Sequence, residues 1–228
     1  MRHVLSMGEM MIQICPSSKG PLRQARLFER YVAGSEGNTL VGLELLGIKT
    51  KFISRVGADE LGLAILNEFR ARGVDVSLVQ QDENGPTGVY FIQRGYPLQD
   101  KSTVLYYRQG SAASLLSEKD VEDVDLTDTR LVLLSGITPA LSASCRRACL
   151  ALREKAEKKD VPLAFDTNVR VALLPDSGQA LELLRPYLES ARYIFTGGGD
   201  LDYLFGSGDL DFRVDKLRKI AKQAEIIL

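Results

Sequence analysis

Residues 50–73 read TKFISRVGADELGLAILNEFRARG, and this stretch carries the alternation on which the predicted fold depends. Residues 50–56 are rich in β-branched and aromatic side chains, which favours a strand, and Gly57 ends it. Asp59 and Glu60 follow, where the partial positive charge of a helix N-terminus favours acidic side chains. Apolar residues then recur at helical spacing to the end of the stretch. The stretch therefore predicts a strand followed by a helix.

Strand and helix patterns alternate on both sides of this stretch. We expect strands at residues 3–7, 131–134, 161–165, 192–195 and 224–228, and helices at residues 36–46, 140–159, 179–190 and 211–223. The run at residues 131–134 is apolar throughout, which is typical of a strand buried on both faces. Strands separated by helices favour a mostly parallel sheet with helices on its two faces. The sequence therefore predicts an α/β fold.

The middle of the chain departs from this alternation. Residues 88–94 and 102–108 are two short runs rich in Val, Ile, Tyr and Phe. The connection between them opens with Gly95-Tyr96-Pro97 and is too short for a crossover helix, so antiparallel pairing is expected. Together with residues 10–14 and 28–32, these runs are expected to form a small sheet that stands off the main one.

The composition excludes several classes of function. Among 228 residues, 29 Lys and Arg balance 30 Asp and Glu, and no basic stripe indicates a nucleic-acid partner. The apolar runs are far shorter than the roughly 20 residues that span a bilayer, so no membrane partner is expected. The N-terminal residues carry charges and lack a secretory signal. These observations favour a cytoplasmic enzyme.

Three cysteines and one histidine limit the chemistry that the chain can support. An odd number of cysteines without framework spacing indicates a reducing compartment. Cys145 and Cys149 share one face of an expected helix and are predicted to pack there, because a structural zinc site needs four N or S ligands. His3 is the only imidazole, which excludes Ser-His and Cys-His mechanisms unless His3 itself serves. We therefore assign no metal ligands and expect catalysis by carboxylates, arginines and backbone dipoles.

Two common nucleotide-binding motifs are missing from the sequence. There is no G-x-x-x-x-G-K-[ST] loop and no G-x-G-x-x-G after the first strand, which argues against P-loop and Rossmann dinucleotide enzymes. A glycine cluster, Thr196-Gly197-Gly198-Gly199-Asp200, does follow an expected strand. Its backbone N–H groups could cradle an anion, or the cluster could be a flexible loop at the strand end.

Several motifs together resemble the ribokinase-like sugar kinases of the phosphofructokinase B (pfkB) type. They are Ala33-Gly34-Ser35-Glu36-Gly37-Asn38 before a helix, the later Gly47 and Gly57, Thr87-Gly88, Tyr106-Tyr107-Arg108 and Asp166-Thr167-Asn168. Glu36 and Leu40 depart from the family signature, and Ala58 replaces the first Asp of its G-D-D turn. Residues 31–36, 86–97, 102–108 and 166–170 are most similar to 2-keto-3-deoxygluconate kinases of the archaeal type. The resemblance covers essentially the whole chain.

The resemblance implies a ribokinase-like three-layer α/β/α domain over residues 1–228, with lid segments at about residues 10–32 and 87–109. It implies transfer of the γ-phosphate of ATP, with Mg²⁺, to 2-keto-3-deoxygluconate or its galactonate epimer. The implied partners are a sugar acid, ATP and a second copy of the chain packed through the lid. Two alternatives remain: a kinase of the same family acting on a neutral sugar, and a non-catalytic fragment that binds sugar or dimerises.

Arg108 is the predicted ligand of the substrate carboxylate, because a planar guanidinium fork matches a carboxylate. Side chains alternate along a strand, so Tyr106 points to the same face as Arg108 and can reach the same ligand. Tyr90 belongs to the neighbouring strand and is assigned to the same substrate site.

The remaining site residues come from the starts and ends of other elements. Gly34 would let the sugar approach the backbone closely, and Asn38 would bind a hydroxyl or act as an ordinary cap. Arg170 would lie at the carboxyl edge of the sheet, where ligands of open α/β folds collect. The resemblance places Asn168 and Thr196 near the nucleotide.

One family motif is not found at its expected place. The catalytic base of the family is an Asp in a G-A-G-D motif at the start of a late helix, and its N–H groups form the anion hole. Residues 196–200 have a similar sequence to this motif, but only one strand separates them from Asp166, whereas the motif is expected several strands later. We therefore assign residues 196–200 to a loop near the nucleotide. The motif is expected beyond Leu228, which predicts that the chain is partial and has no kinase activity by itself.

Overall fold

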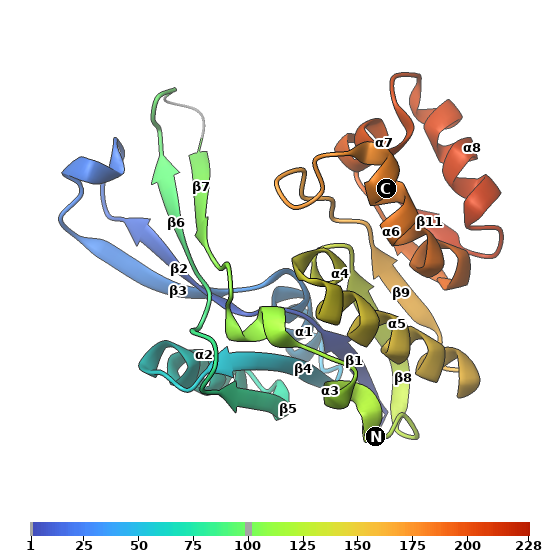
Figure 1. The fold of residues 1–228 in the computed structure, drawn as a ribbon, viewed down its shortest axis with the longest axis horizontal. Helices are drawn as coiled ribbons and strands as arrows, with labels where there is room; N and C mark the ends of the chain where they lie inside the picture. Colours follow the sequence, from blue (N-terminus) through green and yellow to red (C-terminus); the bar gives the residue numbers. More distant parts are fainter. Residues whose placement is uncertain (1, 99–101) are drawn as a thin grey trace.

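The computed structural model describes residues 2–98 and 102–228, and its largest feature is a seven-stranded sheet. Its strands are β1 (His3–Met7), β4 (Thr50–Gly57), β5 (Asp75–Asp82), β8 (Thr129–Ser135), β9 (Leu163–Asp166), β10 (Tyr193–Phe195) and β11 (Glu225–Ile227). They lie in the order β11-β10-β9-β8-β1-β4-β5, and every neighbouring pair is parallel (Figure 1). The predicted α/β fold with a mostly parallel sheet is confirmed.

A second sheet, called here the small sheet, has four strands. They are β2 (Met11–Pro16), β3 (Phe28–Ala33), β6 (Val89–Arg94) and β7 (Ser102–Tyr107), in the order β3-β2-β6-β7. The β6–β7 pair is antiparallel, as its short connection predicts, with Tyr90 directly opposite Tyr106. Because β2 follows the end of β1 and β6 follows the end of β5, the small sheet stands at the carboxyl edge of the main sheet (Figure 1).

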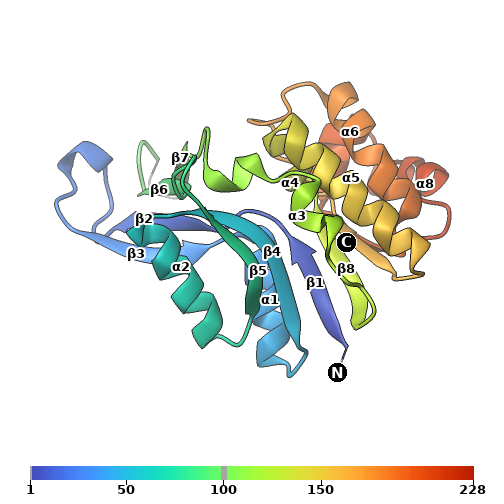
Figure 2. The same cartoon turned by 60° about the horizontal axis from the view of Figure 1, so that its bottom comes forward.

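Helices cover both faces of the main sheet. They are α1 (Ser35–Leu45), α2 (Glu60–Ala71), α3 (Lys119–Glu122), α4 (Thr138–Leu141), α5 (Ala143–Lys158), α6 (Ser177–Ser190), α7 (Gly198–Phe205) and α8 (Leu210–Ile220), with 3₁₀ turns at Leu22–Gln24 and Ala112–Leu115. One core packs α1 and α2 against side chains such as Val4 and Phe52, and the other packs α5 to α8 against Leu5 and Val132 (Figure 2). Alternate residues of a strand thus enter opposite cores. No helix in the described residues is both long and apolar enough to cross a bilayer.

Local chemistry sets the helix boundaries. Asp59 caps α2 by accepting a hydrogen bond from the Gly62 N–H at 2.7 Å, and Ser142 caps α5 by accepting one from the Cys145 N–H at 3.1 Å. Ser142 is extended, so the single helix expected at residues 140–159 is instead a short α4 followed by α5. Helix α2 ends at Ala71, and Gly73 follows its C-cap with a φ of +91°, in the left-handed region that suits glycine.

The glycine cluster at residues 196–200 was wrongly expected to be a loop. Gly197 is the N-cap of α7, and the helix begins at Gly198. Leu201 and Leu204 are buried in the core, which favours a helix here despite the glycines. Asp200 lies in the first turn, where it complements the helix dipole. Apolar packing thus outweighs the poor helix propensity of three consecutive glycines.

Candidate functional site

A buried ion pair joins two of the connections between the main sheet and the small sheet. Glu9 lies between β1 and β2, and Arg108 lies directly after β7. The guanidinium of Arg108 contacts the carboxylate of Glu9, and their side chains are 11% and 1% exposed. The Ser111 hydroxyl donates to the other carboxylate oxygen, Oε1, at 2.6 Å. These contacts fix the position of Arg108 relative to the carboxyl edge of the main sheet.

Arg108 lies against one aromatic side chain of the small sheet, and a second lies next to that one. The guanidinium carbon lies 5.5 Å from the ring centre of Tyr106, within the range of a cation–π contact. The ring of Tyr106 lies 5.6 Å from that of Tyr90, whose hydroxyl donates to Gln13 Oε1 at 2.6 Å. The structure therefore brings together three of the predicted substrate residues.

Arg108 also lines a hollow of about 780 Å³ between the small sheet and the start of α5. The polar side chains that face it include Tyr106, Ser114, Ser144 and Arg147. This volume falls within the range of small-molecule sites, and a mostly apolar lining with a few polar side chains is typical of such sites.

Two glycines enclose the backbone and carboxylate of Glu9. A Cβ built on Gly34 would lie 2.5 Å from the Glu9 carbonyl oxygen, and one built on Gly88 would lie 2.7 Å from Glu9 Oε1. The glycine at position 34 is thus required by backbone packing, and its predicted approach to the sugar stays a prediction. Asn38 is exposed on α1, and its predicted role as a hydroxyl ligand also stays a prediction.

A second group of acidic side chains lies at the carboxyl edge, where β8 and β9 end. Glu36, in the first turn of α1, is buried and accepts hydrogen bonds from Ser135 Oγ at 2.6 Å and Thr138 Oγ1 at 2.7 Å. Glu36, Ser135 and Asp166 line a cavity of about 180 Å³. Burial, and then the charges of Asp200 and Glu36, raise the pKa of Asp166 to about 6.

The residues predicted to lie near the nucleotide gather beside this cavity. Asn168 donates from Nδ2 to Ser35 Oγ at 2.5 Å, and Thr196 Oγ1 lies 2.9 Å from Thr167 Oγ1. Asp200 accepts from Thr167 Oγ1 at 2.6 Å, so the start of α7 is tied to the loop after β9. Arg170 is exposed in that same loop, two residues after Asn168. Loops after two adjacent parallel strands thus meet at one edge, as the rule for open α/β sheets predicts.

The sequence analysis missed Glu9 and Glu36 as site residues. A signal for the first was present, because Glu9 stands in the otherwise uncharged run Met7-Gly8-Glu9-Met10-Met11. A carboxylate among apolar residues must find a partner when it is buried. The identity of that partner, 99 residues later in the chain, follows only from the pairing of the strands.

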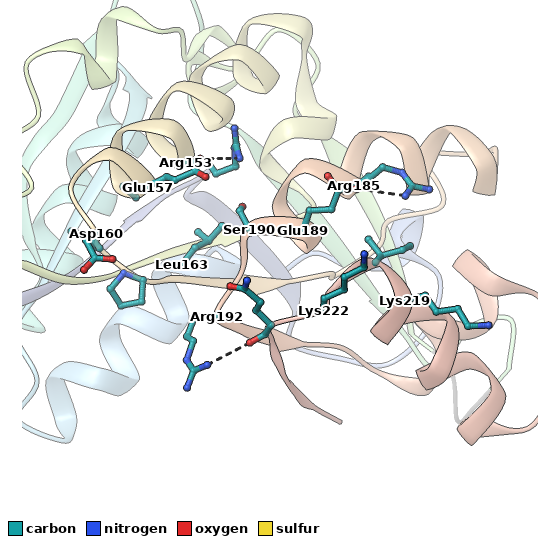
Figure 3. A pocket seen from close by; sticks show the side chains of 15 residues that line it. Arg153, Glu157, Asp160, Leu163, Arg185, Glu189, Ser190, Arg192, Lys219 and Lys222 are labelled. Atoms are coloured by element: carbon teal, nitrogen blue, oxygen red, sulfur yellow. Dashed lines mark hydrogen bonds and ion pairs between the residues drawn. The ribbon is translucent and has the colours of Figure 1, made fainter.

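A hollow of about 710 Å³ lies at the opposite edge, beside the amino ends of β9 and β10 (Figure 3). Its charged side chains are Arg153, Glu157, Asp160, Arg185, Glu189, Arg192, Lys219 and Lys222. Arg153 pairs with Glu157 at 3.4 Å, and Arg185 contacts Glu189 at 3.7 Å. Basic residues in the last turns of α5 and α8 complement the dipoles of these helices. We therefore assign the candidate site to the carboxyl edge.

Comparison with known proteins identifies the family. The pfkB family of carbohydrate kinases matches residues 1–227, and the chain belongs to this family. It is 37% identical over 221 residues to 2-dehydro-3-deoxygluconokinase of Thermoproteus tenax, covering 96% of this chain and 67% of that protein. The same-named protein of Bacillus subtilis is 32% identical, covering 89% of this chain and 62% of its own length. The chain thus spans about two thirds of these relatives.

A solved structure adds a nucleotide complex to the comparison. The chain is similar to an uncharacterized sugar kinase of Pyrococcus horikoshii in complex with ATP, with a TM-score of 0.77 and 26% identity. The match covers 88% of this chain and 65% of that one. The predicted family and ribokinase-like fold are therefore confirmed.

The raised pKa of Asp166 predicts a pH-dependent loss of stability. The folded state keeps this proton up to about pH 6, whereas an unfolded Asp releases it near pH 4. Stability should therefore fall as pH rises from about 4 to 6, by about 1–2 kcal/mol once partial solvent exposure is allowed for. Asp166→Asn should lack this loss. Thermal unfolding of both proteins in EDTA buffers between pH 4.5 and 7.5 measures the difference, and a difference that does not change with pH would contradict the prediction.

Proposed function

We propose that the protein is an ATP-dependent kinase of a sugar acid of the 2-keto-3-deoxygluconate type, the galactonate epimer included. The observation that carries the proposal is Arg108, a largely buried arginine that lines the hollow beside Tyr106. A buried guanidinium is costly unless a carboxylate ligand or an internal partner uses it. The names of the relatives, 2-dehydro-3-deoxygluconokinase, support an acid as the substrate.

The nucleotide and its metal ion would lie at the neighbouring carboxylate group. Asn168 and Thr196 are proposed to lie near ATP, beside Asp166 and Asp200. Mg²⁺ is usually held in such sites by one or two carboxylates together with the phosphates of the substrate. The described residues contain no cluster of three or more His, Cys, Asp or Glu that could bind a metal alone. A cation would also relieve the repulsion between Asp166 and Asp200.

One observation favours a kinase of a neutral sugar instead. Glu9 already balances the charge of Arg108, so the site has no net charge that demands an anionic substrate. Ribose or fructose would then use Tyr106 and the serines of the hollow without engaging the guanidinium.

The assay that separates these possibilities is ATP consumption with a panel of sugars. A protein that also carries the G-A-G-D motif is expected to turn over 2-keto-3-deoxygluconate, with little turnover of ribose or fructose at equal concentration, whereas residues 1–228 alone are expected to show none. Turnover confined to the neutral sugars would favour the alternative substrate class. Binding of the acid without turnover by the protein that carries the motif would favour the non-catalytic alternative. The cytoplasmic location stays a prediction.

We also propose that a second copy of the chain packs on the small sheet. On the face turned away from Tyr90 and Tyr106, this sheet exposes Phe28, Leu105 and Tyr107, the last with 66% of its surface accessible. An exposed apolar sheet face of this kind usually marks an interaction surface. Because the same small sheet occurs in every copy, self-association through a two-fold axis is the simplest way to cover it.

The expected result is a dimer at micromolar concentration that the variant Tyr107→Asp converts to a monomer. Light scattering coupled to gel filtration measures the mass of both proteins. Leu45→Asp is the matched control, because Leu45 is equally apolar and 80% exposed but lies at the end of α1, outside the small sheet. A wild-type monomer, or a dimer that Tyr107→Asp leaves intact, would count against this interface.

A further inference from the structure

Glu9 faces both stabilising and destabilising groups. Arg108 and Ser111 stabilise its carboxylate, by an ion pair and a hydrogen bond at 2.6 Å. Glu36 at the start of α1 adds a like charge, which raises the pKa of Glu9. The charge of Glu9 in turn raises the pKa of Cys145 on α5. Burial raises the pKa of Glu9, whereas Arg108 and Ser111 lower it. The ionised form of Glu9 therefore depends on two partners, and only Arg108 carries a positive charge.

The ion pair of Glu9 and Arg108 uses only part of the guanidinium. Arg108 Nη2 contacts Glu9 Oε2, whereas the Nε atom of Arg108 is buried and makes no hydrogen bond among the described residues. Carboxylates bind a guanidinium best by two parallel N–H···O bonds. Arg108 therefore retains hydrogen-bonding capacity that a better placed carboxylate could use.

We propose that Glu9 and the carboxylate of the sugar acid compete for the guanidinium of Arg108, so that binding of the acid is coupled to uptake of one proton by Glu9. The proposal rests on the proposed function, because it requires an acidic ligand at Arg108. The proton comes from the solvent and converts the Glu9 carboxylate to a neutral carboxylic acid. The guanidinium then balances one carboxylate, that of the ligand, instead of two.

The physical reason is the sharing of one cation by two anions. When the ligand carboxylate approaches Arg108, Glu9 loses part of its stabilising contact and gains a second like charge besides Glu36. Both changes favour the protonated form of a carboxyl group. Protonation gives the buried Glu9 side chain a hydrogen-bonding partner again, because a neutral carboxyl group can donate a hydrogen bond to the ligand carboxylate or to Ser111 Oγ. Glu9 would thereby set both the affinity for the acid and its dependence on pH.

Isothermal titration calorimetry of 2-keto-3-deoxygluconate into the chain tests the proposal. The binding enthalpy is measured between pH 6 and 8 in buffers of different ionisation enthalpy, which gives the number of protons taken up. Wild-type protein is expected to take up between zero and one proton, with a maximum at an intermediate pH. Glu9→Gln is expected to take up none, and to bind the acid about 3- to 10-fold more tightly than wild type at pH 8 because the competing charge is gone.

Two further variants keep the test decisive if Glu9→Gln folds poorly. Ser111→Ala removes the hydrogen bond to the Glu9 carboxylate, so the maximum of proton uptake should move to higher pH. Glu44→Gln is the matched control: Glu44 is also buried, but it bonds to Thr50 at the amino edge of the sheet, and the variant should keep the wild-type uptake.

The outcomes separate this inference from the proposed function. Binding of the acid without proton uptake, or weaker binding by Glu9→Gln, would overturn the competition while leaving the sugar-acid site intact. No binding of the acid by wild type, together with binding of ribose or fructose, would overturn the proposed substrate class itself.

Discussion

Replacing Arg108 by Ala is expected to weaken binding of the sugar acid by at least about 30-fold. Removal of one partner of a buried charged pair costs on the order of 2–5 kcal/mol of binding free energy. The side chain also balances Glu9, which is 3% exposed, so the folded state should lose about 3–5 kcal/mol in addition. Arg108→Lys should be harmful too, since an ammonium cannot present two parallel donors.

Titration calorimetry and chemical unfolding measure these two losses separately. Arg30→Ala is a suitable control, because Arg30 is an exposed arginine of the same small sheet. The control is expected to change neither quantity appreciably. Unchanged affinity of a folded Arg108→Ala protein would remove this residue from the substrate site.

Replacing Arg55 by Ala is expected to cause a loss of stability of similar size. Arg55 donates two hydrogen bonds of 2.8 Å to Asp120 and one of 2.7 Å to Asp82, and both carboxylates are buried. Without the guanidinium, two buried negative charges lose their counter-ion, which costs about 3–5 kcal/mol. The contacts also tie α3 to β4 and β5, so the segment that follows Arg108 should loosen.

An exposed ion pair provides the comparison. Arg72 pairs with Glu68 at 2.7 Å one helical turn away, with both side chains substantially exposed. Arg72→Ala should therefore cost only about 0.2–1 kcal/mol. Urea unfolding of both variants measures the two losses in the free energy of unfolding. The dependence of that free energy on urea concentration should be the same for both variants. A loss for Arg55→Ala no larger than that for Arg72→Ala would show that the buried contacts contribute little.

Most of the fold follows from periodicity, and the exceptions have physical causes. Apolar runs such as residues 131–134 identify buried strands directly, because a strand covered on both faces has no polar side. Strand β5 has no such run: Val76 is buried beside exposed Asp75 and Ser77, as expected at the edge of a sheet, and the sequence analysis assigned no strand there. The helix α7 was missed for a different reason, since glycines are poor helix formers and its stabilising contacts lie in the distant core.

Contacts in the site were predictable from the sequence where they depend on one strand. They were not predictable where they depend on how the strands pair. The alternation that places Tyr106 and Arg108 on one face is local, and the structure places Arg108 against the ring of Tyr106 and that ring beside Tyr90. The contact between Glu9 and Arg108 depends on how both sheets meet, and no local pattern contains that information. The raised pKa of Asp166 likewise arises from burial, and then from the charges of neighbours on α7 and α1, which only folding brings together.

The most direct test is a crystal structure of the chain with bound 2-keto-3-deoxygluconate. The central claim is that the substrate carboxylate binds to the guanidinium of Arg108, with N···O distances of about 2.7–3.2 Å. Glu9 should then have moved away from the shared edge of the guanidinium or be within hydrogen-bonding distance of the ligand carboxylate. A ligand whose carboxylate is bound by Arg170 or Arg147 alone, with the Glu9–Arg108 pair unchanged, would contradict the account.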